Sequence, residues 1–190
     1  MQNFINKIEK IYPLSEDERG FLSGKIKYLK IPAKHLLIKK GDIAKNVYYI
    51  EKGFMDTYCY DSKGHKRVFN FHFDNEIITN HASFLNETPS TFNLESLEET
   101  ELYYINFDDR NDLFEQYPNF INVARLYYEY TLTHFMLQVQ NKFIASPEEK
   151  YLYLMDNHPE IFQKVSLTTI ADYMNIQPQS LSRIRKRLTR

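Results

Sequence analysis

The chain has 190 residues, with 24 Lys+Arg, 25 Asp+Glu and a formal net charge of −1. This length allows one large domain or a domain with a small second one, and a 43% hydrophobic content is sufficient for a buried core. The single cysteine, Cys59, excludes an intrachain disulfide, a Cys-based zinc finger and a four-cysteine iron–sulfur cluster within one chain.

The first 30 residues are predicted to be helical. Apolar residues recur every three or four positions from Phe4 to Ile11, Pro13 breaks the pattern, and Ser15 followed by three acids is typical of a helix N-terminus. Charged residues interrupt the first ten positions, unlike the continuous apolar core of a signal peptide. No uncharged apolar run approaches the ~18 residues that span a bilayer. We therefore expect a cytoplasmic protein with no membrane partner.

From Ile31 the pattern changes to short β-branched or aromatic runs. These runs are residues 36–38, 47–50, 55–60, 68–73 and 102–105. Turn signals at Gly41, Gly53 and Gly64 separate several of them, and glycine supplies the positive φ that tight hairpins need. Strands at about ten-residue spacing with such turns predict an antiparallel sandwich or barrel.

A long helix is predicted for residues 118–145. Its candidate seam has spacings of three and four and consists of Phe120, Val123, Tyr127, Tyr130, His134, Leu137, Asn141 and Ile144. The pattern fits either a two-helix dimer stripe or an amphipathic helix lying on its own sheet. Ser146 and Pro147, followed by two acids, predict the start of another helix and a domain boundary. Its expected buried face is Tyr151, Leu152, Leu154 and Met155.

Residues 166–188 have the pattern of two short helices joined by a tight turn. Ser166 is the expected N-cap of the first helix, Asn175 tolerates the left-handed conformation that ends a helix, and Pro178 suits the first position of the next. The expected inward-facing residues are Leu167, Ile170, Ala171, Met174, Leu181, Ile184 and Leu188. This is the sequence pattern of a helix-turn-helix, in which the second helix enters the major groove.

The second of these helices carries candidate DNA contacts. Gln179, Ser180 and Arg183 share its polar face near the N-terminal end, where Gln can pair with adenine and Arg with guanine. Expected contacts elsewhere are Arg185, Lys186, Arg187 and Arg190 to phosphates, together with Ser166 and Thr168 at the start of the preceding helix. Residues 177–190 hold five bases and no acid, so the near-zero net charge conceals a basic end.

The sequence resembles the Crp/Fnr family of transcription regulators, most clearly at residues 40–53 and 170–188. The resemblance implies an α+β fold: an N-terminal antiparallel β-roll of the double-stranded β-helix or jelly-roll type, a dimerisation helix and a C-terminal winged-helix-type helix-turn-helix domain. The corresponding ranges are 1–117, 118–145 and 146–190. It also implies a homodimer with double-stranded DNA as partner, and RNA polymerase as a further one. Pro178 replaces a basic base-reading residue of some relatives, so the operator sequence is not transferred.

Cyclic AMP is not expected as the effector, and no cofactor is predicted. Family members that bind it hold the ribose with a Gly-Glu pair and the phosphate with an arginine, and these positions are Thr79, Asn80 and Ser90 here. Residues 68–109 contain nine acids and no Lys or Arg, whereas a buried phosphate needs a charged partner or an array of backbone amides. With His81 and Thr91, these three form a candidate pocket for an uncharged or cationic ligand. A ligand-free roll and haem ligation by histidine also remain open.

Two other classes of protein are compatible with a β-barrel of this kind. His65, His72, Glu76 and His81 are the ligand types of a cupin-like metalloprotein, but their spacing departs from the usual paired-His pattern. A β-roll interaction module without specific DNA binding is the other class. The chain has no nucleophile elbow, phosphate loop or HExxH motif, so an enzyme is not predicted.

Overall fold

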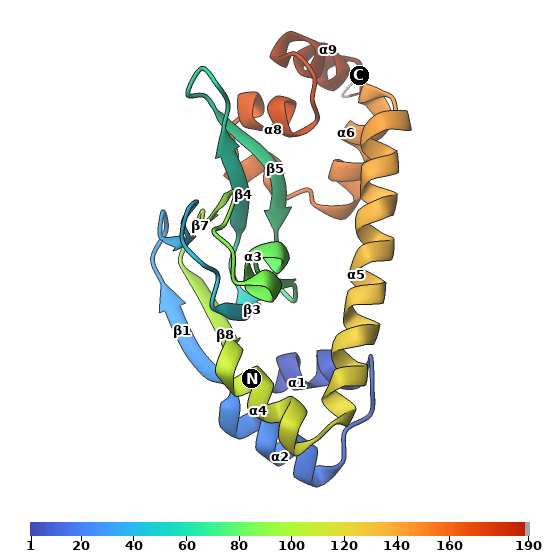
Figure 1. The fold of residues 1–190 in the computed structure, drawn as a ribbon. Helices are drawn as coiled ribbons and strands as arrows, with labels where there is room; N and C mark the ends of the chain where they lie inside the picture. The colour runs from blue at the N-terminus through green and yellow to red at the C-terminus, as the bar shows by residue number, and fades with distance from the viewer. Residues whose placement is uncertain (189–190) are drawn as a thin grey trace. The chain divides into compact units, whose positions relative to one another are not determined.

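The structure is a computed structural model that describes residues 1–188, and the chain forms two compact units, Met1–Tyr128 and Glu129–Arg190. Figure 1 shows the elements of each unit. The division falls inside the longest helix, α5 (Asn119–Ile144).

The first unit is built on two antiparallel four-stranded sheets. The strands are β1 (Lys27–Ile31), β2 (Leu36–Ile38), β3 (Asn46–Lys52), β4 (Met55–Tyr60), β5 (Lys66–His72), β6 (Ile77–Ile78), β7 (Asn93–Ser96) and β8 (Thr100–Asn106). One sheet has the order β1-β8-β3-β6 and the other β2-β7-β4-β5. Sequence-adjacent strands are often placed in different sheets, so the chain crosses between the two layers. The predicted α+β class with an antiparallel roll is confirmed.

The side chains between the sheets form the roll's core. Its fully buried members include Ile50, Met55, Phe84, Leu94 and Leu102. The β-branched and aromatic runs form strands because their alternating side chains fill this space while the intervening residues face outward.

Four helices accompany the sheets. They are α1 (Gln2–Glu9), α2 (Glu16–Lys25), α3 (His81–Asn86) and α4 (Phe107–Gln116). Ser15 caps α2 as predicted, in a capping box with Glu18. The backbone and side-chain hydrogen bonds of that box lower the pKa of the Glu18 carboxyl.

A second apolar cluster joins α1, α2, α4 and the start of α5 to the outer face of the β1-β8-β3-β6 sheet. Phe4 stacks on Tyr49 of β3 with ring centroids 5.0 Å apart, and Phe120 and Val123 of α5 are buried in the same cluster. The first half of α5 therefore packs on its own unit, as one of the two interpretations of the seam predicts.

Four elements of the first unit differ from the sequence-based expectation. Residues 27–31 form a strand, whereas the sequence predicts a helix through residue 30. The elements β6, α3 and β7 are not predicted by the sequence pattern. Lys27 and Lys30 are three residues apart, a spacing that also occurs on one face of a helix, and they belong to a largely exposed edge strand.

The second unit contains the rest of α5 followed by four shorter helices. These are α6 (Pro147–Asn157), α7 (Ile161–Lys164), α8 (Leu167–Tyr173) and α9 (Pro178–Leu188). Ser146 caps α6 in a capping box with Glu149, as the sequence predicts for the start of this helix. Within residues 107–188 every regular element is a helix, so the strands of a wing are not part of the described chain.

The core of the second unit is smaller than the predicted one. Its buried residues include Tyr151, Leu154, Ile161, Ile170, Ala171, Met174, Leu181 and Ile184. Leu152, Met155, Leu167 and Leu188 are predicted to face inward and are instead 38–40% exposed. A bundle of short helices has room in its centre for about one or two residues per turn, so the outer members of each apolar stripe lie at its edge.

Candidate functional site

The turn between α8 and α9 is fixed by local hydrogen bonds. The Ser166 Oγ accepts the Thr169 N–H at 3.1 Å and caps α8. Asn175 has a positive φ of 56°, and the Ile176 N–H donates to the Ala171 carbonyl at 2.9 Å. Pro178 is the first residue of α9. The predicted cap, left-handed asparagine and helix start are all confirmed.

Burial orients α9 about its axis. Leu181 is fully buried and Ile184 is 8% exposed, and α9 packs on α8, whose Ile170 and Ala171 are also fully buried. The small side chain of Ala171 allows the two helices to approach closely. With this face buried, the opposite face of α9 is exposed.

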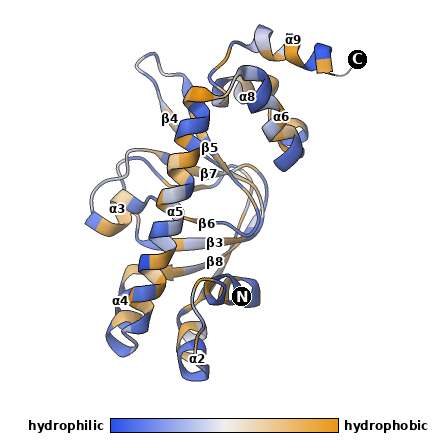
Figure 2. Cartoon of the chain, turned by 90° about the vertical axis from the view of Figure 1, so that its right-hand side faces the viewer, coloured by the Kyte–Doolittle hydropathy of each residue, from blue (hydrophilic) through white to orange (hydrophobic). Residues whose placement is uncertain are grey.

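Four of the six predicted DNA contacts within α9 are exposed. Gln179, Arg183, Lys186 and Arg187 are exposed, whereas Ser180 and Arg185 are half-buried. Figure 2 shows hydrophilic residues at the C-terminal end of this helix. Residues 177–188 hold four bases and no acid, and the predicted phosphate contact Arg190 lies outside the described residues. We call the exposed and half-buried polar residues of α9 the basic face.

One residue of the basic face is neutralised by the second unit itself. Arg187 forms an ion pair with Glu148 of α6. Arg183 instead directs its Nε to the Gln179 carbonyl at 3.4 Å, on the same helix. The two arginines therefore differ in charge environment, which the sequence does not predict because Glu148 lies 39 residues before Arg187.

Of the two DNA contacts predicted at the start of α8, Ser166 has a structural role that occupies its hydroxyl group. Both Ser166 and Thr168 are exposed. The Ser166 Oγ is already engaged with the backbone N–H and the Oγ1 of Thr169, the latter at 2.8 Å. Thr168 is the less constrained of the two.

In the roll, the structure brings Asn80 and Ser90 together. The Asn80 Nδ2 donates to the Ser90 Oγ at 2.8 Å, while the Asn80 Oδ1 caps α3 by accepting the Ser83 N–H at 3.1 Å. The Ser90 hydroxyl donates onward to the Phe92 carbonyl at 2.7 Å. Both side chains are 3% exposed. Their hydrogen-bonding groups are therefore used within the protein.

The other three predicted pocket residues do not converge with this pair. The Thr79 Oγ1 donates to the Asn46 carbonyl at 2.8 Å. Thr91 is exposed. His81 packs edge-on against Tyr128, with ring centroids 5.5 Å apart, and burial lowers the pKa of its imidazole. The expected five-residue polar pocket is thus dispersed among separate environments.

Comparison with known proteins identifies the roll. Residues 28–117 match the family model of the cyclic nucleotide-binding domain. This stretch contains all eight strands except the first residue of β1, together with α3 and α4. The roll is therefore similar to a cyclic nucleotide-binding domain, and two helices precede the matched stretch.

Solved structures share this fold over most of the chain. The c-di-GMP responsive global regulator CLP of Xanthomonas campestris has a TM-score of 0.67 at 16% identity over 92% of each chain. FixK2 of Bradyrhizobium japonicum has a TM-score of 0.68 at 16% identity, over 86% of this chain and 84% of its own. The catabolite activator protein of Thermus thermophilus has a TM-score of 0.59 at 15% identity, over 96% and 86%. No curated protein matches the sequence. These identities establish the fold alone.

The histidines of the domain do not gather into a metal site. The His72 imidazole lies between the Thr57 Oγ1 at 2.6 Å and the Glu76 carboxylate at 3.2 Å. His65 is on a turn, where its partner is Asp61 at 3.4 Å. Across residues 1–188 no three His, Cys, Asp or Glu side chains are grouped closely enough to hold a metal ion. The arrangement expected of a cupin-like centre is therefore not found in this part of the chain.

The helices of the described residues do not have the hydropathy of membrane spans. Even α5, the longest of them, lacks the sustained apolar character needed to cross a bilayer.

Proposed function

We propose that the chain is a sequence-specific DNA-binding transcription regulator of Crp/Fnr type, with no enzymatic activity. The observation that carries the proposal is the second unit: a turn fixed by Asn175 holds α9 with one side buried and the basic face exposed. A helix presented in this way can enter the major groove, with polar residues near its N-terminus at base edges. The proposal also agrees with the fold shared with CLP of Xanthomonas campestris, which is a global regulator.

The proposal divides the basic face into two kinds of contact. Gln179, Ser180 and Arg183 lie within the first two turns of α9 and would read bases. Arg185, Lys186 and Arg187 lie in its last turns and would contact phosphates. Phosphate contacts fix the position of the helix and depend on salt, whereas base contacts supply the preference for one sequence.

A homodimer through the long helix is part of the proposal. The half of α5 that belongs to the second unit exposes large apolar side chains: Leu132, Phe135, Met136, Leu137, Phe143 and Ile144 are each at least 50% exposed. Figure 2 shows apolar residues recurring along this helix. Burial of such a stripe against a second copy would remove it from water and produce a two-fold symmetric pair of α9 helices.

The direct test is a titration of the protein against DNA from its own upstream region and against random DNA of equal length. A regulator of this kind binds the first at least about a thousandfold more tightly at physiological salt. Equal affinity for the two DNAs would refute sequence-specific regulation and favour a roll that acts as an interaction module.

We also propose that the domain does not respond to cyclic AMP. At the positions where the resemblance places the ribose-binding acid and the phosphate-binding arginine, Asn80 and Ser90 hydrogen-bond to each other and are buried. A cyclic phosphate placed there would lose its hydration without gaining a cation.

Isothermal titration with cyclic AMP and with cyclic GMP is expected to give no binding heat up to about 1 mM. Without the phosphate-binding arginine, the nucleotide loses a charged hydrogen bond, and this loss lowers affinity on the order of ten- to a hundredfold. Saturable micromolar binding of either nucleotide would contradict the proposal. Asn80→Ala serves as the matched control because it opens the buried pair without adding a cation, and it is expected to bind neither nucleotide.

The Glu148–Arg187 ion pair predicts a change in nonspecific affinity. Replacement of Glu148 by glutamine frees Arg187 for a phosphate, so affinity for random DNA is expected to rise about two- to fivefold, and the slope of log affinity against log salt to become steeper by up to about one. The measurement is a fluorescence anisotropy titration at several salt concentrations.

The matched control is Asp156→Asn, which removes the same charge from an exposed position on the same helix α6. It is expected to change nonspecific affinity by less than Glu148→Gln. An equal gain in both variants would show that overall charge, and not release of Arg187, is responsible.

A further inference from the structure

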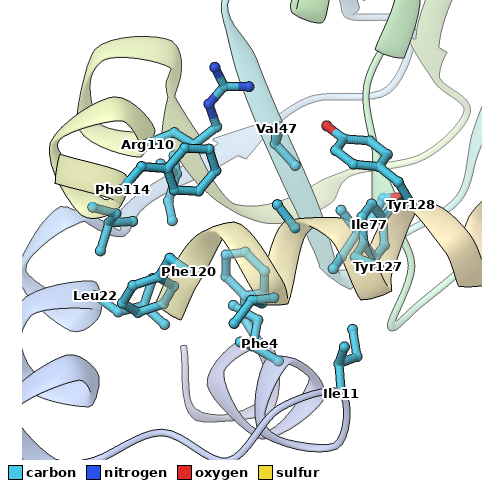
Figure 3. Close-up of a pocket in the computed structure, with 15 residues that line it drawn as sticks. Phe4, Ile11, Leu22, Val47, Ile77, Arg110, Phe114, Phe120, Tyr127 and Tyr128 are labelled. Carbon is cyan, nitrogen blue, oxygen red and sulfur yellow. Dashed lines mark hydrogen bonds between the residues drawn. The ribbon is translucent and has the colours of Figure 1, made fainter. Parts of the chain in front are cut away.

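A cavity of about 120 Å³ that is partly open to solvent lies in the first unit, and the dispersed polar residues of the roll do not line it. Its wall is formed by α1, α2, α4, the first part of α5 and the outer side of the β1-β8-β3-β6 sheet (Figure 3). All of its lining residues belong to Met1–Tyr128. Thr79, Asn80, Ser90 and Thr91 are not among them, so this cavity is distinct from the position of a cyclic nucleotide.

The wall is almost entirely apolar. Phe4, Ile8, Phe120 and Val123 are among the buried side chains that face it. The phenol of Tyr127, which also lines the wall, donates to the Ile77 carbonyl at 3.2 Å and so leaves its ring toward the cavity. An enclosed cavity of similar size lined by such side chains, about 150 Å³, accepts a benzene-sized molecule. This wall likewise offers apolar contacts to a ring of that size and almost no hydrogen-bonding groups.

Arg110 is the one charged residue of the wall. Its guanidinium lies over three aromatic rings, those of Phe107 at 4.5 Å, Phe84 at 4.9 Å and Phe114 at 5.2 Å. The Nε is buried without a hydrogen-bond partner. Among the described residues, Arg110 donates to the Asn111 side chain at 2.9 Å, hydrogen-bonds to the Tyr128 hydroxyl and forms no ion pair with a carboxylate. A half-buried cation next to an apolar cavity is thus left without a counter-ion.

We propose that this cavity binds a small aromatic monocarboxylate, with the ring in the apolar space and the carboxylate paired with Arg110. The planar guanidinium fork matches a carboxylate and forms charge-assisted hydrogen bonds with it. A whole nucleotide does not fit, because sites for larger ligands enclose about 300–1,000 Å³. A neutral aromatic compound would fill the same space but would leave the arginine unpaired.

The occupant would contact α5 directly, since Phe120, Val123, Ala124, Tyr127 and Tyr128 of this helix all line the cavity. The same helix continues into the second unit. An effect of the ligand on DNA binding would rest on the proposed function, whereas binding of the ligand to the cavity does not. Ligand binding can therefore be refuted without refuting the proposed function, and the proposed function can be refuted without refuting ligand binding.

The test is isothermal titration of the full chain, without DNA, with phenylacetate and with its neutral counterpart 2-phenylethanol. Phenylacetate is expected to bind with one site per chain and at least about tenfold more tightly than the alcohol, because only the acid forms the charged pair. Absence of phenylacetate binding at millimolar concentration, or equal affinity for both compounds, would overturn the proposal.

Two variants and one control locate the site. Arg110→Gln is expected to remove the preference for the acid, while Arg125→Gln, which removes the same charge from an exposed position on α5, is expected to keep it. Ala124→Phe fills the cavity and should abolish binding of both compounds with Arg110 still present. Unchanged phenylacetate binding by folded Ala124→Phe would place the ligand elsewhere and overturn the assignment.

Discussion

Replacement of Arg183 by alanine is expected to lower affinity for the protein's operator by about 10- to 100-fold and to change affinity for random DNA only slightly. A bidentate arginine–guanine contact provides about 1–3 kcal/mol of discrimination between bases. Arg183 is exposed in the second turn of α9, and its Nε forms only a long hydrogen bond of 3.4 Å to the Gln179 carbonyl, which a base could readily replace. Anisotropy titrations of both DNAs at one salt concentration measure the effect.

Lys186→Ala is the matched control for this prediction. Lys186 is exposed on the same helix but one turn further from its N-terminus, where phosphates are expected. Its removal should weaken binding to both DNAs by a similar factor and reduce the salt slope by about one. If Arg183→Ala instead weakened both DNAs equally, Arg183 would be a phosphate contact and the assignment of the base-reading end would be wrong.

Gly53→Ala is expected to destabilise the β-roll by about 2–4 kcal/mol. Gly53, between β3 and β4, has a φ of 145°, and an added Cβ would lie 2.4 Å from the Oγ1 of the fully buried Thr100. Its N–H donates to the Asp74 carboxylate at 2.7 Å, so the backbone cannot move without breaking that bond. Urea denaturation followed by circular dichroism gives the free energy of unfolding.

The control is Gly20→Ala in α2, where an added methyl group meets no atom within 4 Å and φ is not positive. Alanine favours a helix interior over glycine by up to about 1 kcal/mol, so this variant should be equally or more stable than the wild type. A Gly53→Ala protein as stable as the wild type would show that the close approach of Gly53 and Thr100 is not required by the fold.

Local chemistry makes much of the fold predictable. Ser15, Ser146 and Ser166 each cap the helix that the sequence predicts, because the cap and its partner lie within three residues of each other. Strand β4 has the bounds expected from its aromatic and β-branched run. The helix predicted over β1 is wrong because Lys27 and Lys30 have a spacing that also suits a helix, and the strand lies at an exposed sheet edge, where burial gives only a weak pattern.

The features of the helix-turn-helix and of the roll that the sequence does not predict depend on contacts between residues far apart in the chain. The Glu148–Arg187 pair and the Asn80–Ser90 hydrogen bond join residues 39 and 10 positions apart, and each depends on packing that periodicity does not encode. Leu167 and Leu188 have the correct spacing for a core, but the second unit is too small to cover them. The cavity next to Arg110 is lined by residues from several helices and a sheet, so no short sequence motif predicts it.

Selection of bound sequences from a random DNA pool tests most directly whether this chain is a sequence-specific regulator. A dimer that presents two α9 helices should enrich one pseudo-palindromic sequence, with half-sites centred about 10–10.5 base pairs apart, one turn of the double helix. Arg183→Ala should lose the preference at one position of each half-site. Recovery of no preferred sequence after repeated rounds would contradict sequence reading by α9.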